Sequence, residues 1–352
     1  MKHTPIQALH THLGATMGNE EGWNMPRRYT NLVDEHLAAR SACGIFDISH
    51  LSKFSIQGKA AEALLDKICC NNVEHTADGH CYDTLLLNRQ GVIIDKILLC
   101  RENGEQYFII GSAAQEDTVE QWLRKHLPPG EVTVQNVTGN LSAMSLQGPD
   151  SEAIFRKVMP DLEYPAEGSY ESMRYRGSRI HIIRKQKTRT TTGFEFFCEA
   201  NRGIAWFKSF MAAGAIPCGM DARECLRLEQ GLASATFDTQ NLTPSEASLE
   251  HMCHHSKPYL GKENYEASPK HDKRLTPLRC AEESDTPRKG DVVKNLYGQK
   301  VGTVTSGCIS PALSHGVALA MLCTKYSHPG TPVRIIIHGH AVPAVVTEAG
   351  IH

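Results

Sequence analysis

Two ionisable residues stand side by side in an otherwise apolar run of the chain. Asp95 and Lys96 lie within Val92–Cys100, which also holds three isoleucines. A carboxylate in such a run must find hydrogen-bond partners or shift its pKa, which makes Asp95 a candidate site residue. The alternative is a strand position that faces solvent, and the residues alone leave both open. Because side chains alternate along a strand, we expect Lys96 on the opposite face from Asp95.

Two arginines form a second candidate. Arg223 and Arg227 are four residues apart and share one face of an expected helix. Two guanidiniums on one face suit a carboxylate or phosphate ligand. Glu224 and Glu229 stand close by, so ordinary ion pairing is the alternative, and the spacing alone favours it.

The sequence predicts no metal site. The densest group of possible ligands is His251-Met-Cys253-His254-His255, but consecutive residues do not converge on one tetrahedral ion. A solvated polar turn is the favoured interpretation. The twelve cysteines are scattered without a Cys-x-x-Cys pair, which predicts reduced and mostly buried thiols.

Composition excludes several classes of protein. The chain has 352 residues, enough for two or three domains, and a formal net charge of -2. No global field therefore attracts nucleic acid or an anionic membrane. The first residues lack the apolar stretch of a secretory signal, and no apolar run is long enough to span a bilayer. We expect a cytoplasmic protein with neither nucleic acid nor membrane as partner.

The helices and strands that position these residues are predicted from hydrophobic periodicity and from the turn residues between periodic segments. Helices are expected at 32–43, ending at Gly44, and at 59–70, 115–127, 152–159 with Asp150 as N-cap, and 221–230. Strands are expected at 51–57, 84–87, 92–100, 107–110, 179–183 and 194–198. A polar linker is expected at 262–273. The strands expected after it, at 291–293, 300–306, 316–322, 332–337 and 341–346, predict a small all-β barrel, so the fold class is α+β.

Several strings resemble motifs of the glycine-cleavage T-protein (aminomethyltransferase) family, in the same order along almost the whole chain. They are Thr4-Pro5, Gly22-Trp-Asn-Met-Pro26, the segment Arg40–His50 with Gly44, Phe46, Asp47 and Ser49, Leu146-Gln-Gly-Pro149, Ala222-Arg-Glu224 with Arg227-Leu-Glu229, Tyr259-Leu-Gly-Lys-Glu263, Arg288-Lys-Gly290, and Val301-Gly302 through Ser310-Pro311.

The resemblance implies a three-domain cloverleaf around a central channel that holds tetrahydrofolate. It places the first lobe at 1–50 and about 138–262, the second at 51–137, and the C-terminal barrel at about 274–352. The family takes an aminomethyl group from a lipoyl-carrier protein, releases ammonia and gives 5,10-methylenetetrahydrofolate. Some relatives demethylate small molecules as methyltransferases in one-carbon metabolism.

The resemblance also implies site residues. The family's pterin-binding glutamate matches Glu195, and its Ala-Arg-Asp arginine matches Arg223. Both suit a folate: a carboxylate accepts from the pterin donors, and a guanidinium binds an anionic group.

Other positions depart from the family pattern. Its second catalytic aspartate is Lys96 here, beside Asp95. A family tyrosine corresponds to Asp83, with Tyr82 shifted by one, and the strand-end asparagine motif places Ser112 among the expected cofactor contacts. The glycine-rich segment has become the basic, Thr-rich 185–192, without its folate-contacting tyrosine.

These departures leave three functions open. The first is folate-dependent transfer of an aminomethyl or methyl group, with Asp95 and Lys96 at the catalytic positions and Glu195, Arg223, Tyr82 and Ser112 binding the cofactor. The second is a non-catalytic folate-binding or regulatory protein. The third is an enzyme on this scaffold that no longer uses folate.

Overall fold

The computed structural model describes residues 1–185, 192–267, 272–281 and 286–348. Contacts divide the chain into two compact units. Unit 1 comprises Met1–Leu86, Ile94–Arg223 and Ser256–Tyr259, and unit 2 comprises Leu87–Ile93, Glu224–His255 and Leu260–His352. The finer division into three domains stays a prediction.

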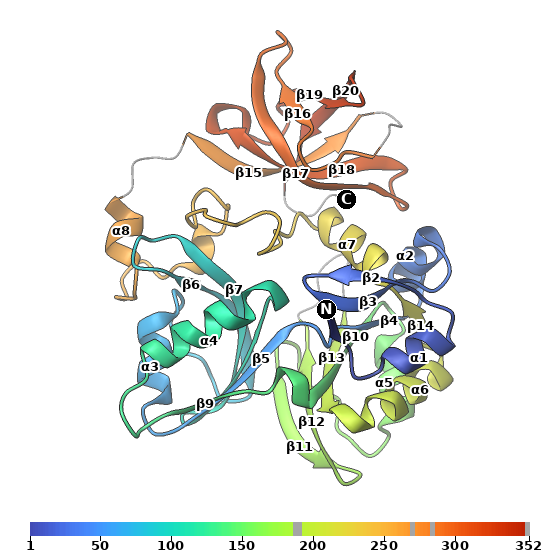
Figure 1. The fold of residues 1–352 in the computed structure, drawn as a ribbon, viewed down its shortest axis with the longest axis vertical. Helices are drawn as coiled ribbons and strands as arrows, with labels where there is room; N and C mark the ends of the chain where they lie inside the picture. The colour runs from blue at the N-terminus through green and yellow to red at the C-terminus, as the bar shows by residue number, and fades with distance from the viewer. Residues whose placement is uncertain (186–191, 268–271, 282–285, 349–352) are drawn as a thin grey trace. The chain divides into compact units, whose positions relative to one another are not determined.

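A six-stranded sheet forms one half of unit 1, in the order β11-β12-β13-β10-β4-β14. Its helices α5 and α6 pack on one face, where a core of Phe, Ile, Met and Trp side chains excludes water (Figure 1). The strands are β4 (Gly44–Asp47), β10 (Leu141–Gln147), β11 (Tyr170–Tyr175), β12 (Ser178–Arg184), β13 (Gly193–Glu199) and β14 (Ile216–Cys218), and the helices are α5 (Ser151–Val158) and α6 (Gly203–Ala213).

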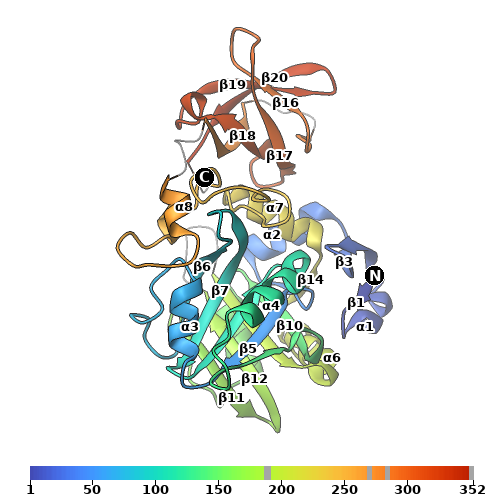
Figure 2. The ribbon, with the colours of Figure 1, turned by 60° about the vertical axis from the view of Figure 1, so that its left-hand side comes forward.

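A five-stranded sheet, in the order β6-β7-β8-β5-β9, forms the other half. Helix α4 contacts β5 and β9, and Figure 2 shows α3 alongside β6. The elements are β5 (Ser52–Gln57), α3 (Ala61–Ile68), β6 (His80–Leu87), β7 (Ile93–Asn103), β8 (Gln106–Gly111), α4 (Glu116–Lys125) and β9 (Thr133–Asn136).

The two sheets of unit 1 face each other through aromatic side chains. Phe108 of β8 stacks on His181 of β12 at 4.8 Å and meets Phe197 of β13 edge-on at 5.5 Å. Strand alternation then decides which residues point between the sheets. Glu195 shares a face with Phe197, and Lys96 shares a face with Phe108, whose partner in the register is Cys100. Both therefore belong to the inter-sheet faces.

A small sheet and two helices come from the first 41 residues of the chain, and one further helix spans residues 220–229. The sheet order is β1-β3-β2, and Trp23 and Met25 pack with Ala113 and Met220. The elements are β1 (Lys2–His3), α1 (Gln7–His12), β2 (Thr16–Glu20), β3 (Trp23–Arg28), α2 (Leu32–Ser41) and α7 (Met220–Glu229).

Unit 2 contains a closed six-stranded barrel in the order β15-β18-β17-β16-β19-β20, which confirms the expected all-β tail. Its interior is filled by Val, Ile, Leu and Ala side chains. The elements are α8 (Lys262–Ala267), β15 (Lys273–Cys280), β16 (Val292–Lys294), β17 (Lys300–Ser310), β18 (His315–Cys323), β19 (Pro332–Ile337) and β20 (His340–Val346).

Most expected elements are confirmed, with shifted ends, and two expectations were wrong. Helix α2 ends at Ser41, and Gly44 instead begins β4, where a Cβ would meet Cys218 Sγ at 3.0 Å. Asp150 is the N-cap residue of α5, as expected, although its side chain makes no capping hydrogen bond. The linker expected from residue 262 begins with α8. The sequence analysis did not predict helices α1, α6 and α8 or strands β1–β4, β9–β11, β14 and β15. Helix α6 was missed because it is aromatic-rich and its apolar residues are not confined to one stripe.

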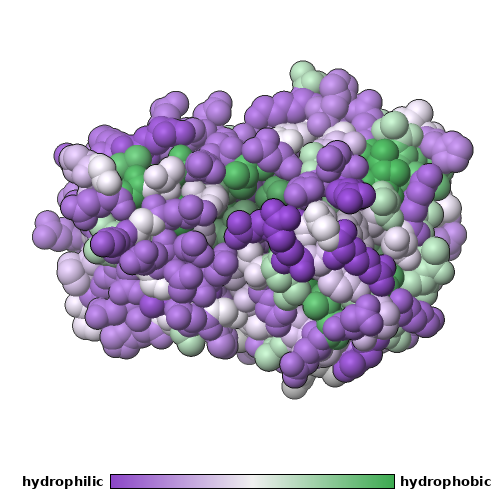
Figure 3. Space-filling view, turned by 90° about the horizontal axis from the view of Figure 1, so that it is seen from below, coloured by the Kyte–Doolittle hydropathy of each residue, from purple (hydrophilic) through white to green (hydrophobic). Residues whose placement is uncertain are grey.

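The surface is mixed. Figure 3 shows a face that is largely hydrophilic, with hydrophobic residues in small separate groups. Within the described part of the chain, no helix has the length and apolar character needed to cross a membrane.

Candidate functional site

Asp95 is a buried carboxylate that accepts hydrogen bonds from Ser112 and from the backbone of Lys96. Ser112 donates to it twice, from its backbone N–H at 2.9 Å and from Oγ at 2.6 Å. The side chain is fully buried, and burial raises the pKa of Asp95 to about 6 despite these hydrogen bonds. Ser52 and Gly111 lie on the same face, because a Cβ at Gly111 would meet Asp95 Oδ2 at 2.7 Å and Ser52 Oγ at 2.9 Å.

The raised pKa of Asp95 has a consequence for stability. Its folded-state pKa of about 6 exceeds the ordinary 3.8, so its favourable contribution is complete below about pH 4 and is lost as pH rises through 6. We expect Asp95→Asn to abolish this loss, which is on the order of 3 kcal/mol between about pH 4 and pH 7. Urea unfolding of both proteins at the two pH values measures it. Asp117→Asn, at an exposed position of α4, is the control, and equal pH dependence in wild type and Asp95→Asn would contradict the expectation.

Lys96 lies on the other face of β7 and forms an ion pair with Asp83 of β6. The Nζ–Oδ2 distance is 3.1 Å, with Lys96 about three-quarters buried and Asp83 half-exposed. Lys96 and Asp83 are the two positions where the sequence departs from the resembled aspartate and tyrosine. The two substituted positions therefore form an ion pair in which the positive charge of Lys96 is balanced by the negative charge of Asp83.

A disulfide joins the same two strands. Cys81 of β6 is bonded to Cys100 of β7, so the expectation that all thiols are reduced was wrong at this pair. The two residues are 19 apart in sequence, and only the pairing of β6 with β7 brings them together. The remaining ten cysteines form no disulfide, and eight of them are buried, as expected.

Glu195 is buried on β13 and carries one cation. Lys185 Nζ lies 2.7 Å from its Oε1, and the carboxylate side chain is 8% exposed against 37% for the lysine. Residues 186–191 of the basic segment lie outside the described part of the chain. The carboxylate therefore lies on an inter-sheet face with a partly exposed lysine as its partner.

Two buried basic residues were missed by sequence reasoning. Lys53 of β5 is fully buried, and its Nζ donates to the carbonyl oxygens of Ser49 at 2.9 Å and Leu51 at 2.6 Å. Burial lowers the pKa of Lys53 to about 7. His50 is also buried, and burial, followed by the charge of Arg223, lowers its pKa to about 3. The sequence signal that could have revealed Lys53 is a lysine near the start of a strand whose neighbouring residues are buried.

The two arginines of α7 have different environments. Arg227 pairs with Glu224 at 2.5 Å and with the fully buried Asp238 at 2.9 Å, so the ion-pair alternative holds for it. Arg223 is half-buried, and the described residues provide no salt bridge to its guanidinium. Of these two arginines, Arg223 is the one without a salt bridge among the described residues, which leaves its guanidinium available to an anionic ligand.

Tyr82 and Ser112 do not lie on the same face as Lys96. Tyr82 alternates with Asp83 on β6, and burial raises the pKa of its hydroxyl, with contributions from Cys69 and Asp66 on the side of α3. Ser112 is engaged by Asp95. The structure thus puts Lys96 and Glu195 on the inter-sheet faces, and it separates Asp95, Ser112 and Tyr82 from them.

In unit 1 two sheets face each other with a buried glutamate on one of them, and unit 2 contains a closed barrel. These features agree with the protein families that the sequence matches. The family model described as GCVT N-terminal domain matches residues 6–257, and the one described as glycine cleavage T-protein C-terminal barrel domain matches residues 273–350. The chain belongs to the glycine cleavage T-protein family.

Individual relatives agree with this assignment. An aminomethyltransferase of Chlorobium chlorochromatii is 32% identical over 348 residues, covering 96% of this chain and 95% of the relative. One of Chlorobaculum tepidum is also 32% identical, covering 98% and 97%. The crystal structure of glycine cleavage system aminomethyltransferase T from Bartonella henselae matches with a TM-score of 0.91 at 23% identity, covering 100% of this chain and 98% of that one, which shows the shared fold.

Proposed function

We propose that this protein transfers a one-carbon group, aminomethyl or methyl, between a donor and tetrahydrofolate. The observation that carries the proposal is Glu195, a buried carboxylate on an inter-sheet face whose cation, Lys185, is partly exposed. Within the family, folate supplies the nucleophilic amine that accepts the carbon. Names of the relatives support a transferase, since those quoted above are aminomethyltransferases.

The residues present fit a folate in part. Glu195 can accept from the pterin amino group and N3–H, a charge-assisted pairing. Arg223 offers a guanidinium with no salt bridge from the described residues, and His50 keeps a buried Nδ1 without a hydrogen-bond partner there. Asp95 supports the strand end through Ser112 and does not reach the inter-sheet faces. We therefore assign binding to Glu195 and Arg223, and positioning to Asp95, Ser112 and Tyr82.

The donor is either a lipoyl-carrier protein, as in the family, or a small amine. Lys96 argues against efficient use of the standard donor. Paired with Asp83, it provides no carboxylate at this position to stabilise the cationic carbon that ammonia loss creates or to accept the proton of the attacking amine. The reaction proposed is folate-dependent transfer with an altered donor or a low rate.

A second candidate is a folate-binding protein without catalysis, favoured by the same Lys96–Asp83 pair. Mixing the pure protein with tetrahydrofolate and candidate amine donors separates the two. Formation of 5,10-methylenetetrahydrofolate or 5-methyltetrahydrofolate supports transfer, and binding without turnover supports the second candidate. Absence of folate binding rejects both and favours the enzyme without folate.

Replacing Glu195 by alanine is expected to weaken tetrahydrofolate binding roughly tenfold or more, because a hydrogen bond to a charged group contributes about 1.5–3 kcal/mol. Isothermal titration calorimetry measures the change. Glu199→Gln, at the exposed end of the same strand, is the matched control and should bind as the wild type does. Unchanged affinity in Glu195→Ala would place the pterin elsewhere.

A further inference from the structure

Two free thiols of unit 2 lie in contact although they are far apart in sequence. The Sγ atoms of Cys225, on α7, and Cys308, on β17, are 3.2 Å apart. Cys225 is fully buried, and Cys308 is half-buried. Cys225 Sγ also contacts the carbonyl oxygen of Ile309 at 3.6 Å. A pair of sulfur atoms this close is the basic requirement for binding a thiophilic ion.

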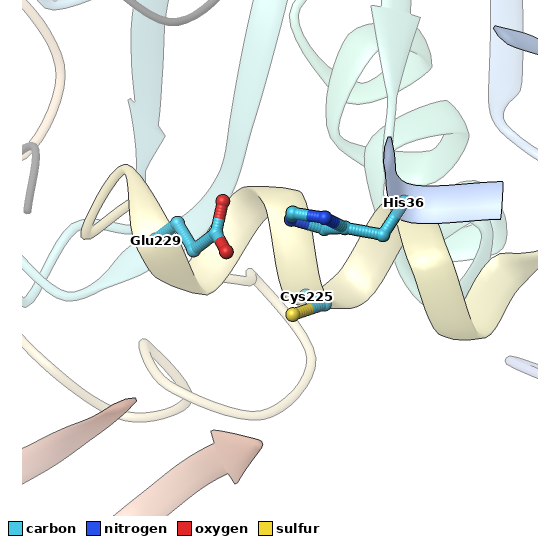
Figure 4. Close-up of side chains that lie close together, drawn as sticks. All are labelled: His36, Cys225 and Glu229. Atoms are coloured by element: carbon cyan, nitrogen blue, oxygen red, sulfur yellow. The ribbon is translucent and has the colours of Figure 1, made fainter. Parts of the chain in front are cut away.

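A carboxylate joins the thiols from the same helix. Glu229 follows Cys225 by four residues, so both side chains project from one face of α7 (Figure 4, where His36 of α2 is also drawn). Its carboxylate oxygen lies within 4.8 Å of Cys225 Sγ. The side chain is 2% exposed, and Ser310 Oγ of β17 donates to Oε1. A buried carboxylate oriented by a serine resembles a metal ligand held by an outer hydrogen bond.

We propose that Cys225, Cys308 and Glu229 form a binding site for a thiophilic divalent cation of the zinc class. Two sulfur ligands and one oxygen ligand suit Zn²⁺, which prefers four tetrahedral ligands, and water from the half-buried side of Cys308 supplies the fourth. On binding, each of the two thiols loses its proton to solvent, so one M²⁺ replaces the two thiol H⁺. No electron is transferred.

The geometry favours an ion at this pair, because the buried carboxylate of Glu229 completes a set of two sulfur atoms and one oxygen atom. A bound dication deprotonates a coordinating thiol outright. The three ligands belong to unit 2, whereas Glu195 and Lys96 belong to unit 1, and the existence of the site does not depend on the proposed folate chemistry.

Cobalt titration of the full-length protein tests the proposal. The metal-free protein is kept reduced with a phosphine, and Co²⁺ is added while the near-ultraviolet spectrum is followed. We expect an intense sulfur-to-cobalt charge-transfer band that saturates at one ion per chain and disappears when Zn²⁺ displaces Co²⁺. Zinc should also raise the melting temperature, because an ion that binds only the folded state stabilises it.

Variants assign the ligands. Cys308→Ser and Cys225→Ser should lose the band, and Glu229→Gln should bind roughly tenfold more weakly or worse. Cys323→Ser, which removes another half-buried thiol of the barrel, is the matched control and should keep it. Cys308→Ser is the safer of the two thiol variants, and its circular dichroism verifies the fold. A folded wild type without a band, or an equal band in Cys308→Ser, overturns the proposal.

Discussion

Aspartate at position 96 is expected to raise transfer from an aminomethyl-lipoyl donor by roughly 10²–10⁴-fold, the usual contribution of a positioned acid or base. A carboxylate there stabilises the cationic carbon left by departing ammonia and accepts a proton from the attacking amine. Lys96 does neither while it is paired with Asp83. Preorganised charge of the right sign is often a large catalytic term.

The ion-pair partner of Lys96, Asp83, provides a second variant for this experiment. In Lys96→Asp alone, the new carboxylate faces Asp83, and like charges at short range raise one pKa and weaken the effect. The double variant Lys96→Asp/Asp83→Tyr removes that repulsion and should exceed the single variant. Formation of 5,10-methylenetetrahydrofolate measures both, and Lys67→Asp, at an exposed position of α3, controls for net charge. A wild-type rate of about 1 per second or faster would show that another base serves the site.

Replacing Arg227 by methionine is expected to lower the free energy of unfolding by about 3–5 kcal/mol, because breaking a buried ion pair leaves a charge uncompensated. Asp238 is fully buried and accepts from Arg227 Nη1 at 2.9 Å. Without the guanidinium, the described residues leave Asp238 with neutral donors, among them the hydroxyl groups of Thr305 at 2.6 Å and Ser306 at 2.7 Å.

Chemical denaturation of the purified variants measures the loss. Arg223→Met is the matched control on the same helix. Since the described residues give Arg223 no salt bridge, it should unfold within about 1 kcal/mol of the wild type while binding tetrahydrofolate more weakly. Equal destabilisation by both substitutions would mean that the pairing of Arg227 with Asp238 contributes little.

Local pattern was sufficient for much of the architecture. Periodicity predicted α3, α4 and α5, and alternation with turn residues predicted the strands of the C-terminal barrel apart from β15. Alternation also predicted that Asp95 and Lys96 face opposite sides of one strand, because that depends only on local backbone geometry. The order of the family motifs predicted the family, which the matches to residues 6–257 and 273–350 confirm.

The partners of the charged and sulfur-bearing residues depended on tertiary structure. Arg223 and Arg227 share one spacing, yet only Arg227 meets a buried aspartate. Lys53 became a buried amine because the elements around its strand close over it.

The thiol pairs make the same point over a longer range. Cys225 and Cys308 are 83 residues apart, and contact between α7 and β17 brings their sulfur atoms together. Secondary structure follows from periods of two or 3.6 residues, which a sequence displays directly. Ion pairs, thiol pairs and shifted pKa values follow from which distant segments exclude water together, and local sequence patterns do not record that.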